Sequence, residues 1–182
     1  MDQGPVASSR PWLAIGREIA GVLERVDPLA FERLVDRFRE PSRRWFFSGQ
    51  GRSGLAAQMA AMRFMHMGRS AHFVGEPTAP SIRAGDGLAL VSGSGETPVS
   101  IHFARLAKNE GAEIVLITRH PSSTLATLAD VVLPVPIYAS EQFGGSLFEQ
   151  VALILLDAIV LEIAASAPDA HQGMLHRHTN LQ

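Results

Sequence analysis

The sequence of 182 residues contains no cysteine. It therefore cannot form a disulfide bond, a thiolate metal site or a cysteine nucleophile, and this absence favours a cytoplasmic location. Lysine is almost absent as well, because Lys108 is the only lysine among the 16 basic residues. Lys108 lies near the polar end of an expected helix, where a lysine is normally solvated. A Schiff-base or pyridoxal phosphate enzyme needs a buried, activated lysine and is therefore not expected.

Excess charge and long apolar runs are also lacking. The formal net charge is -2, so no bulk basic field is available to attract nucleic acid. The longest apolar stretch, residues 151–165, is too short for a membrane span and contains Asp157 and Glu162. It predicts a buried helix. The N-terminus has no apolar run preceded by basic residues, so no signal peptide is expected.

What remains is the composition of one globular domain, with 46% hydrophobic residues. Short β-branched runs alternate with segments of helical periodicity. We expect two helices within residues 12–39, with Asp27 and Pro28 as cap and first-turn residue of the second. The later helices are expected at 53–68, 98–111, 122–130 and 145–165, and the strands at 44–49, 71–75, 87–95, 113–118 and 131–136. The residues after 166 read as a polar tail.

This alternation predicts an α/β fold with a doubly wound, five-stranded parallel sheet of flavodoxin-like type. The strands show little polar alternation, which indicates burial on both faces and helices on each side of the sheet. No repeat or interdomain linker is visible, so residues 1–182 form one expected domain, with 1–43 as N-terminal helices. In such a fold the site lies beyond the carboxyl ends of the strands.

The first expected loop at that edge is "GQGRSG", residues 49–54, with glycines spaced as in the dinucleotide-binding fingerprint. Glu76 lies 22 residues beyond Gly54, near the end of the second expected strand, where an acid would bind a ribose. A dehydrogenase, however, normally needs a further catalytic region, for which the chain leaves little room. The loop is therefore equally a candidate to bind the phosphate of a ligand other than a dinucleotide.

The second loop, "SGSGETP" at residues 92–98, favours a single phosphate group. It offers the hydroxyls of Ser92, Ser94 and Thr97, and Thr97 followed by Pro98 forms an N-cap and a first-turn proline. Backbone N–H groups at such a helix start bind anions. Hydroxyls and amides without a lysine suit one phosphomonoester better than a pyrophosphate. The alternative is a serine-glycine turn that only caps the helix.

Together the two loops resemble the sugar isomerase (SIS) domain. The segments "GQGRSGLAAQMAAMRFMHMG", "SGSGETPVS", "GGSLFEQ" and the terminal "RHTNLQ" are similar to the 6-phospho-3-hexuloisomerase family, from about residue 45 onward. The chain departs from that pattern at Gln50, where a small residue is expected, and at Gln182, where an acid is common. The resemblance implies a cofactor-independent isomerase of D-arabino-hex-3-ulose 6-phosphate, which forms fructose 6-phosphate in formaldehyde fixation by the ribulose monophosphate pathway.

The resemblance also assigns roles to residues. It implies that Glu149 shuttles the proton, although Ser146 and Glu149 alone also fit a helix capping box. Glu96 and Glu76 are alternative bases. His178 in the tail is implied to fold over a site, in its own or a neighbouring subunit, whereas a tail histidine is otherwise normally solvated. The implied substrate-binding residues are Gly51, Arg52, Ser53, Ser92, Ser94, Glu96 and Thr97; Arg52 also fits a surface salt bridge, and no histidine spacing indicates a metal site.

Other functions stay open at this point. They include another SIS isomerase, acting on arabinose 5-phosphate or a phosphoheptose, and a non-catalytic sugar-phosphate sensor. Such a sensor commonly carries a helix-turn-helix domain, and the residues before the first expected strand are too few for one. The apolar helices 53–68 and 145–165 predict a homo-oligomer, and the resemblance implies a tetramer and a functional link to hexulose-phosphate synthase.

Overall fold

The computed structural model describes residues 10–181. It contains a parallel sheet of five strands, as the sequence predicted, and the strand order is β2-β1-β3-β4-β5. The strands are β1 (Trp45–Gly49), β2 (Ala71–Phe73), β3 (Gly87–Val91), β4 (Glu113–Thr118) and β5 (Val131–Pro134). The helices are α1 (Pro11–Leu23), α2 (Pro28–Arg39), α3 (Arg52–His66), α4 (Pro98–Asn109), α5 (Thr124–Leu128), α6 (Ser146–Ala165) and α7 (Ala170–Arg177).

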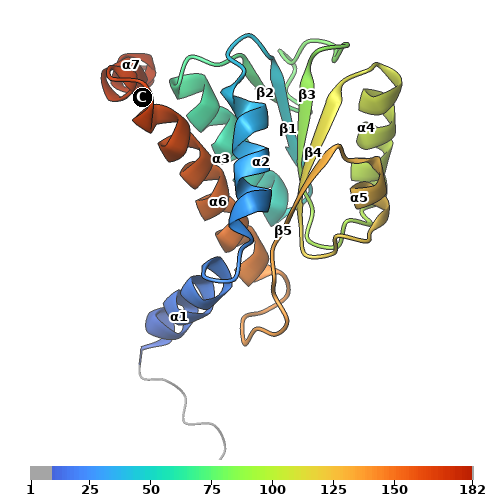
Figure 1. The fold of residues 1–182 in the computed structure, drawn as a ribbon, viewed down its shortest axis with the longest axis vertical. Helices are drawn as coiled ribbons and strands as arrows, with labels where there is room; N and C mark the ends of the chain where they lie inside the picture. Colours follow the sequence, from blue (N-terminus) through green and yellow to red (C-terminus); the bar gives the residue numbers. More distant parts are fainter. Residues whose placement is uncertain (1–9, 182) are drawn as a thin grey trace, which may run out of the picture.

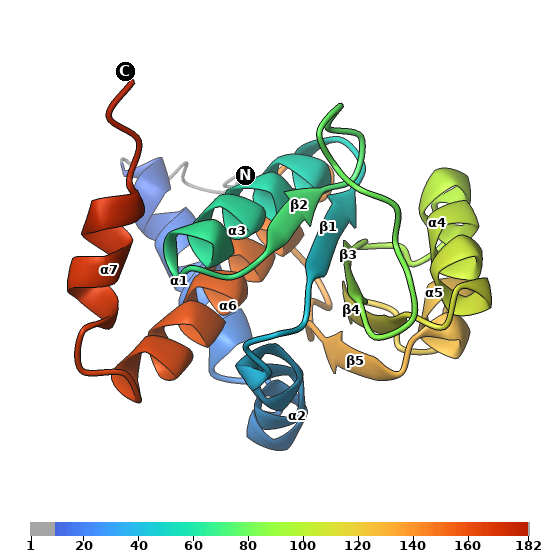
Figure 2. The same ribbon diagram turned by 90° about the horizontal axis from the view of Figure 1, so that it is seen from above.

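Helices cover both faces of the sheet, which makes the fold three-layered (Figure 1). Successive side chains of a strand point to opposite faces, and in β1 this divides Trp45 and Phe47 from Phe46. Trp45 and Phe47 pack with α2, α3 and α6, and Phe46 packs on the side of α4 and α5. Figure 2 shows these two helical layers from above. Burial on both faces explains why the strands lack polar alternation.

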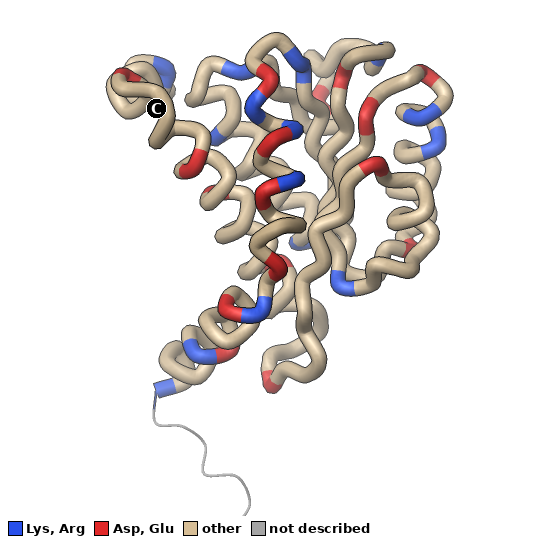
Figure 3. Tube along the Cα trace, viewed as in Figure 1, with Lys and Arg blue, Asp and Glu red and all other residues tan. Residues whose placement is uncertain are grey.

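Charged residues avoid the sheet. Figure 3 shows acidic and basic positions alternating along α2, whereas the strands are almost free of them. Glu113, at the start of β4, is the single charged strand residue within 10–181. Arg37 and Arg43 form ion pairs with its carboxylate, and its side chain stays 16% exposed. Charged residues thus lie on the outer surface of the protein, and the parallel sheet beneath the helices is buried.

The local signals for helix ends act largely as expected. Asp27 is the N-cap of α2, and its side chain accepts a hydrogen bond from the backbone N–H of Leu29 at 3.0 Å, with Pro28 in the first turn. One expectation was wrong: the segment read as a polar tail forms α7. Its apolar residues are few, but Met174 packs against the main core, and this tertiary contact gives the helix a reason to form.

Candidate active site

The glycines of the loop after β1 are required by close backbone contacts. A Cβ atom on Gly49 would lie 2.8 Å from the carbonyl oxygen of Ser53, and one on Gly54 would lie 2.7 Å from that of Gly49. Gly51 is the N-cap of α3 with a φ of 57°, in the left-handed region. The three glycines are thus explained by the turn from strand to helix, without any dinucleotide.

The loops that follow β1 and β3 are neighbours in space. The two strands are adjacent and parallel, and Gly49, the last residue of β1, pairs with Val91, the last residue of β3. From β1 the chain continues to β2 on one side of this pair, and from β3 it continues to β4 on the other side. Residues 50–54 and 92–97 therefore meet at the switch point of the sheet, where ligands bind in open α/β folds.

The loop after β3 presents its hydroxyl groups in an ordered turn. Ser92 Oγ accepts a hydrogen bond from the N–H of Gly95, and Ser94 Oγ accepts one from the N–H of Glu96, both at 3.2 Å. Each hydroxyl keeps its own proton to donate. Thr97 is the N-cap of α4, with Pro98 in the first turn, and its side chain makes no capping hydrogen bond. The hydroxyl of Thr97 and the first N–H groups of α4 can therefore face an anion.

Helix α5 braces this loop from behind. Gly95 has a φ of 66°, and a Cβ atom there would lie 2.0 Å from Ser123 Oγ. The carboxylate of Glu96 accepts a hydrogen bond from the N–H of Thr124 at 2.7 Å. This bond is the main reason why the pKa of Glu96 is lowered. Glu96 therefore holds the loop against α5 while its side chain stays on the surface.

Glu149 lies in the first turn of α6 and forms an ion pair with Arg52, in the first turn of α3. Its side chain is 12% exposed and that of Arg52 is 64% exposed, so the carboxylate is sheltered while the guanidinium reaches solvent. The neighbouring Phe148 ring would contact a Cβ atom on Gly93 at 3.1 Å. Glu149 is therefore held beside both loops of the switch point.

The capping box at the start of α6 does not form. Gly145 is the N-cap and makes no side-chain capping bond, since it has no side chain. Ser146 Oγ instead donates a hydrogen bond to the carbonyl oxygen of Phe143 at 2.8 Å. Glu149 is thus not engaged as a cap, and its position has to be explained by Arg52 and the site.

Two further groups at this edge were not singled out from the sequence. Arg119 follows β4, its backbone N–H donates to the carbonyl oxygen of Gly93 at 3.3 Å, and its buried Nε atom has no hydrogen-bond partner among the described residues. Gln150 Oε1 is likewise buried and unpaired within residues 10–181. Buried polar atoms without partners are costly, and they concentrate at sites completed by a ligand or water. No local sequence pattern distinguishes either residue from an ordinary surface side chain.

Helix α1 holds the loop that leads into α6. Glu18 accepts hydrogen bonds from the N–H of Glu141 at 2.8 Å, the side-chain amide of Gln142 at 2.9 Å and the hydroxyl of Ser140 at 3.0 Å. These bonds, led by that from Glu141, lower the pKa of Glu18. Glu18 is therefore a positioning residue for the segment that precedes Glu149. No local sequence pattern predicts this contact, because Glu18 lies far from residues 140–142 in the sequence.

The variant Glu18→Ala should lower kcat/KM about tenfold, because it removes three hydrogen bonds of roughly 1 kcal/mol each from the loop before Glu149. The matched control is Glu24→Ala at the exposed end of the same helix, which should leave kcat/KM unchanged. Steady-state kinetics and circular dichroism on both variants provide the measurement. Equal kcat/KM for Glu18→Ala and the unaltered protein would show that the loop keeps its place without Glu18.

Within the same chain, His178 lies beside the C-terminal end of α3, whereas Arg52 lies at the N-terminal end of that helix. Its ring stacks on that of His66 with centroids 5.2 Å apart, and Arg177 donates a hydrogen bond to the carbonyl oxygen of His66 at 3.1 Å. His66 is buried, and burial is the main reason that its pKa is lowered. Arg52 and His66 are the first and last residues of α3, which is about 20 Å long. The structure thus brings Glu149 together with the two loops but places His178 apart from them.

The remaining candidates have simpler surroundings. Glu76 follows β2, and its carboxylate accepts a hydrogen bond from the N–H of Phe73 at 3.5 Å. Lys108 is on the surface, and its ammonium donates to the carbonyl oxygen of Leu128 at 3.3 Å.

Within residues 10–181, no three His, Asp or Glu side chains gather in a way that could hold a metal ion. No helix of the same range is long and apolar enough to span a bilayer.

Comparison with known proteins identifies the family of the chain. Residues 40–161 match the model of the SIS domain family. A protein from Mycobacterium gastri named 3-hexulose-6-phosphate isomerase is 39% identical over 91% of this chain and 86% of its own length. A protein of the same name from Bacillus subtilis is 38% identical over 75% of this chain and 79% of its own length.

A solved structure leads to the same family. The crystal structure of a protein from Methanococcus jannaschii, described as inferring a 3-hexulose-6-phosphate isomerase function, has a TM-score of 0.83 and 31% identity. The match covers 95% of this chain and 99% of that one. The chain therefore belongs to the SIS domain family and, within it, to the 3-hexulose-6-phosphate isomerases.

Proposed function

We propose that this protein interconverts D-arabino-hex-3-ulose 6-phosphate and fructose 6-phosphate. The observation that carries the proposal is the position of Glu149, sheltered beside the hydroxyl loop 92–97 and paired with Arg52. A carboxylate next to a phosphate-binding loop suits proton transfer on a sugar phosphate. The names of the relatives from Mycobacterium gastri and Bacillus subtilis support the same substrate.

In the proposed reaction, Glu149 removes the proton from carbon 2 of the 3-ketose. The electrons of that C–H bond form the double bond of a cis-enediol, and the carbonyl oxygen at carbon 3 gains a proton. Glu149 then returns its proton to carbon 3 while the hydroxyl at carbon 2 loses one, which leaves the carbonyl at carbon 2. One carboxylate serves both steps, and no cofactor or metal is included in the proposal.

The remaining site residues receive binding roles. Ser92, Ser94 and Thr97 would donate hydrogen bonds to the phosphate at the start of α4, where the helix dipole also favours an anion. Gly51, Arg52 and Ser53 would bind the sugar oxygens, with Arg52 stabilising the negative charge of the enediolate. Glu96 contributes by holding the loop in place through Thr124.

The substrate should enter in its open-chain form. With the carbonyl at carbon 3 and oxygen 6 phosphorylated, no five- or six-membered hemiketal ring can close. A dedicated acid or base for ring opening is then unnecessary in the direction of fructose 6-phosphate. This agrees with a site in which one sheltered carboxylate, that of Glu149, lies beside both loops.

A coupled assay tests the proposal. The hexulose phosphate is made in place by a purified synthase from formaldehyde and ribulose 5-phosphate. The fructose 6-phosphate formed is converted by added glucose 6-phosphate isomerase and followed through glucose 6-phosphate dehydrogenase. In deuterium oxide, new fructose 6-phosphate should carry deuterium at carbon 3, because the carboxyl proton of Glu149 exchanges with solvent while the enediol is bound. Turnover of arabinose 5-phosphate or a phosphoheptose instead would identify another SIS isomerase, and binding of fructose 6-phosphate without turnover would identify a sensor.

The proposal includes a homo-oligomer, a tetramer by family resemblance, in which His178 serves the site of a neighbouring subunit. Within one chain His178 stacks on His66, far from Glu149. Large apolar side chains of α3 and α6 are exposed and could pack against a second copy: Leu55, Met59, Met62, Met65, Ile154 and Leu161. A histidine in such a site would move protons between the substrate hydroxyls. A cytoplasmic location and a functional link to hexulose-phosphate synthase complete the proposal.

Mixing two inactive variants tests the exchange of His178 between subunits. If Glu149 and His178 act across a twofold interface, an equal mixture of co-refolded Glu149→Gln and His178→Ala chains should regain about one quarter of the activity of the unaltered protein, since half of the random pairs contain one intact site out of two. If both residues act within one chain, every site lacks one of them and mixing restores nothing. Size-exclusion chromatography with light scattering should confirm that both variants keep the same oligomeric state.

A further inference from the structure

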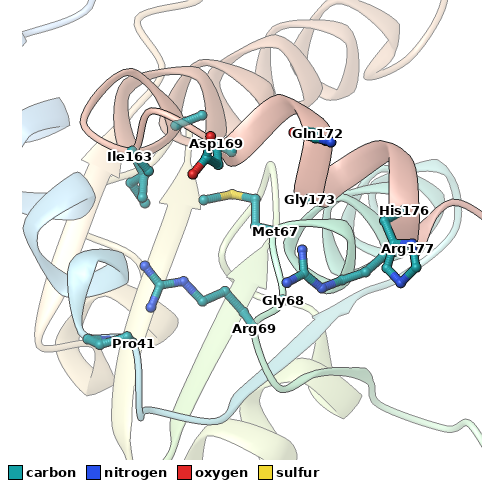
Figure 4. A pocket seen from close by; sticks show the side chains of 13 residues that line it. Pro41, Met67, Gly68, Arg69, Ile163, Asp169, Gln172, Gly173, His176 and Arg177 are labelled. Atoms are coloured by element: carbon teal, nitrogen blue, oxygen red, sulfur yellow. The ribbon is translucent and has the colours of Figure 1, made fainter.

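A second pocket, of about 740 Å³, lies at the opposite edge of the sheet from Glu149. Its walls are α7, the end of α6 and the segments just before β1 and β2 (Figure 4). Pro41 precedes the start of β1 and Arg69 precedes the start of β2. The pocket is therefore separated from the loops 50–54 and 92–97 by the length of the strands.

Positive charge predominates in this pocket. Arg69 and Arg177 line it, against the single carboxylate of Asp169. Figure 4 shows Asp169 above the two arginines in that view. Among the described residues, neither guanidinium forms an ion pair with a carboxylate. This contrasts with Arg52, whose partner is Glu149.

The two guanidinium groups also keep most of their hydrogen-bond donors unused within the described chain. Arg69 donates to the backbone oxygen of Arg39 at 3.4 Å, and Arg177 donates to that of His66 at 3.1 Å. A guanidinium has five N–H donors. Glu40, the acid whose charge acts on Arg69, has its own carboxylate bonded to the hydroxyl of Ser42 at 2.6 Å. Burial lowers the pKa of Arg69, so its charge lacks full compensation.

Two glycines fix the place of Arg177. A Cβ atom on Gly68 would lie 2.8 Å from Arg177 Nη2, and one on Gly173 would lie 3.0 Å from Arg177 Nη1. Gly68 also has a φ of 82°, which other residues rarely adopt. The guanidinium is thus held between the turn after α3 and the body of α7. A donor group fixed in advance loses little entropy when a ligand binds.

We propose that this pocket binds a small phosphate-bearing molecule, with Arg69 and Arg177 holding the phosphate. Guanidinium groups match phosphate oxygens in pairs, and the volume lies in the range of small-molecule sites. Because Arg69 belongs to the body of the protein and Arg177 to α7, the bound anion would fasten α7 to the body. The inference rests on this pocket and holds whether or not the chain has the proposed isomerase activity.

Hydrogen–deuterium exchange of the full chain, with inorganic phosphate as the probe, tests this proposal. Phosphate at ten times its Kd should slow exchange of residues 166–178 about tenfold. Sodium chloride of equal ionic strength should not, because screening alone forms no contact. The variant Arg69→Gln should lose this protection but keep any protection of residues 92–98, and Arg69→Lys should retain part of it. Arg105→Gln, which removes an exposed arginine of α4, is the matched control and should behave like the unaltered protein.

Hydrogen–deuterium exchange of residues 166–178 and of residues 92–98 is measured on separate peptides. The result for α7 is therefore independent of the result for the catalytic loop. Protection of 166–178 that disappears in Arg69→Gln alone supports the second site. Protection confined to 92–98, or protection of 166–178 that persists in Arg69→Gln, overturns it. Loss of protection in Arg105→Gln as well as in Arg69→Gln would indicate a general charge effect and would also overturn it.

Discussion

Replacing Glu149 by glutamine is expected to lower kcat by about 10³-fold while leaving the fold and the binding of fructose 6-phosphate intact. Glutamine has nearly the same shape as glutamate and can still contact Arg52, but it cannot accept and return a proton. Removal of a positioned general base typically costs 10²–10⁴-fold. Since the loop 92–97 is unchanged, KM should move far less than kcat.

The matched control is Glu162→Gln, which removes another carboxylate of α6. Glu162 is half exposed and pairs with Arg39 at 3.4 Å, away from the loops of the site. It should keep full kcat, because exposed ion pairs contribute little. Solvent deuterium incorporation at carbon 3 should fall in parallel with kcat in Glu149→Gln only. Full turnover by Glu149→Gln would assign the base to another residue, with Glu76 the next to test.

The expectation for Glu149 shows what a local sequence pattern can predict and what it cannot. Ser146 and Glu149 match a capping box by spacing, yet the structure starts the helix at Ser146 itself and uses its hydroxyl to bond Phe143. A spacing rule cannot decide which residue is the N-cap when glycines stand before it, because the turn conformation decides that. The pairing with Arg52 crosses 97 positions in the chain and depends on the packing of α3 against α6.

The sheet was predictable for a stronger reason. Each strand is a short, mostly apolar run with little polar alternation, and β4 and β5 are also rich in β-branched residues. Such runs, alternating with segments of helical periodicity, are typical of a parallel sheet that helices cover on both faces. The switch point between β1 and β3 then follows from strand order, and with it the meeting of the two glycine-rich loops. The loops could thus be found from the sequence because their residues lie beside strands.

The supporting contacts could not be found in this way. Glu18 reaches Gln142 from α1, and Met174 anchors α7 on the main core. Both depend on where a peripheral helix packs, and a helix without strong amphipathic pattern gives little indication of that. The same applies to Arg69 and Arg177, which meet at one pocket only because α7 folds back over the end of α3.

The second large effect concerns the loop after β1, where Gly54→Ala is expected to destabilise the protein by about 3 kcal/mol. The added Cβ atom would lie 2.7 Å from the carbonyl oxygen of Gly49 and 3.1 Å from its carbonyl carbon. These are backbone atoms of a buried strand, so they cannot turn aside as a flexible side chain would. Relief requires α3 to move away from β1, against the packing of Ala57 and Phe64 in the core.

Thermal unfolding should therefore show a Tm lowered by about 6–12 °C for Gly54→Ala, on the basis of about 2–4 °C per kcal/mol for a chain of this size. Gly16→Ala in α1 is the matched control: a Cβ atom there meets nothing within 4 Å, and alanine should raise stability by about 0.5–1 kcal/mol. Movement of α3 would also shift Arg52 away from Glu149, so activity should fall with stability in Gly54→Ala but not in Gly16→Ala. An unchanged Tm for Gly54→Ala would mean that the turn can open without cost, and the close approach of strand and helix would then not be what requires glycine at this position.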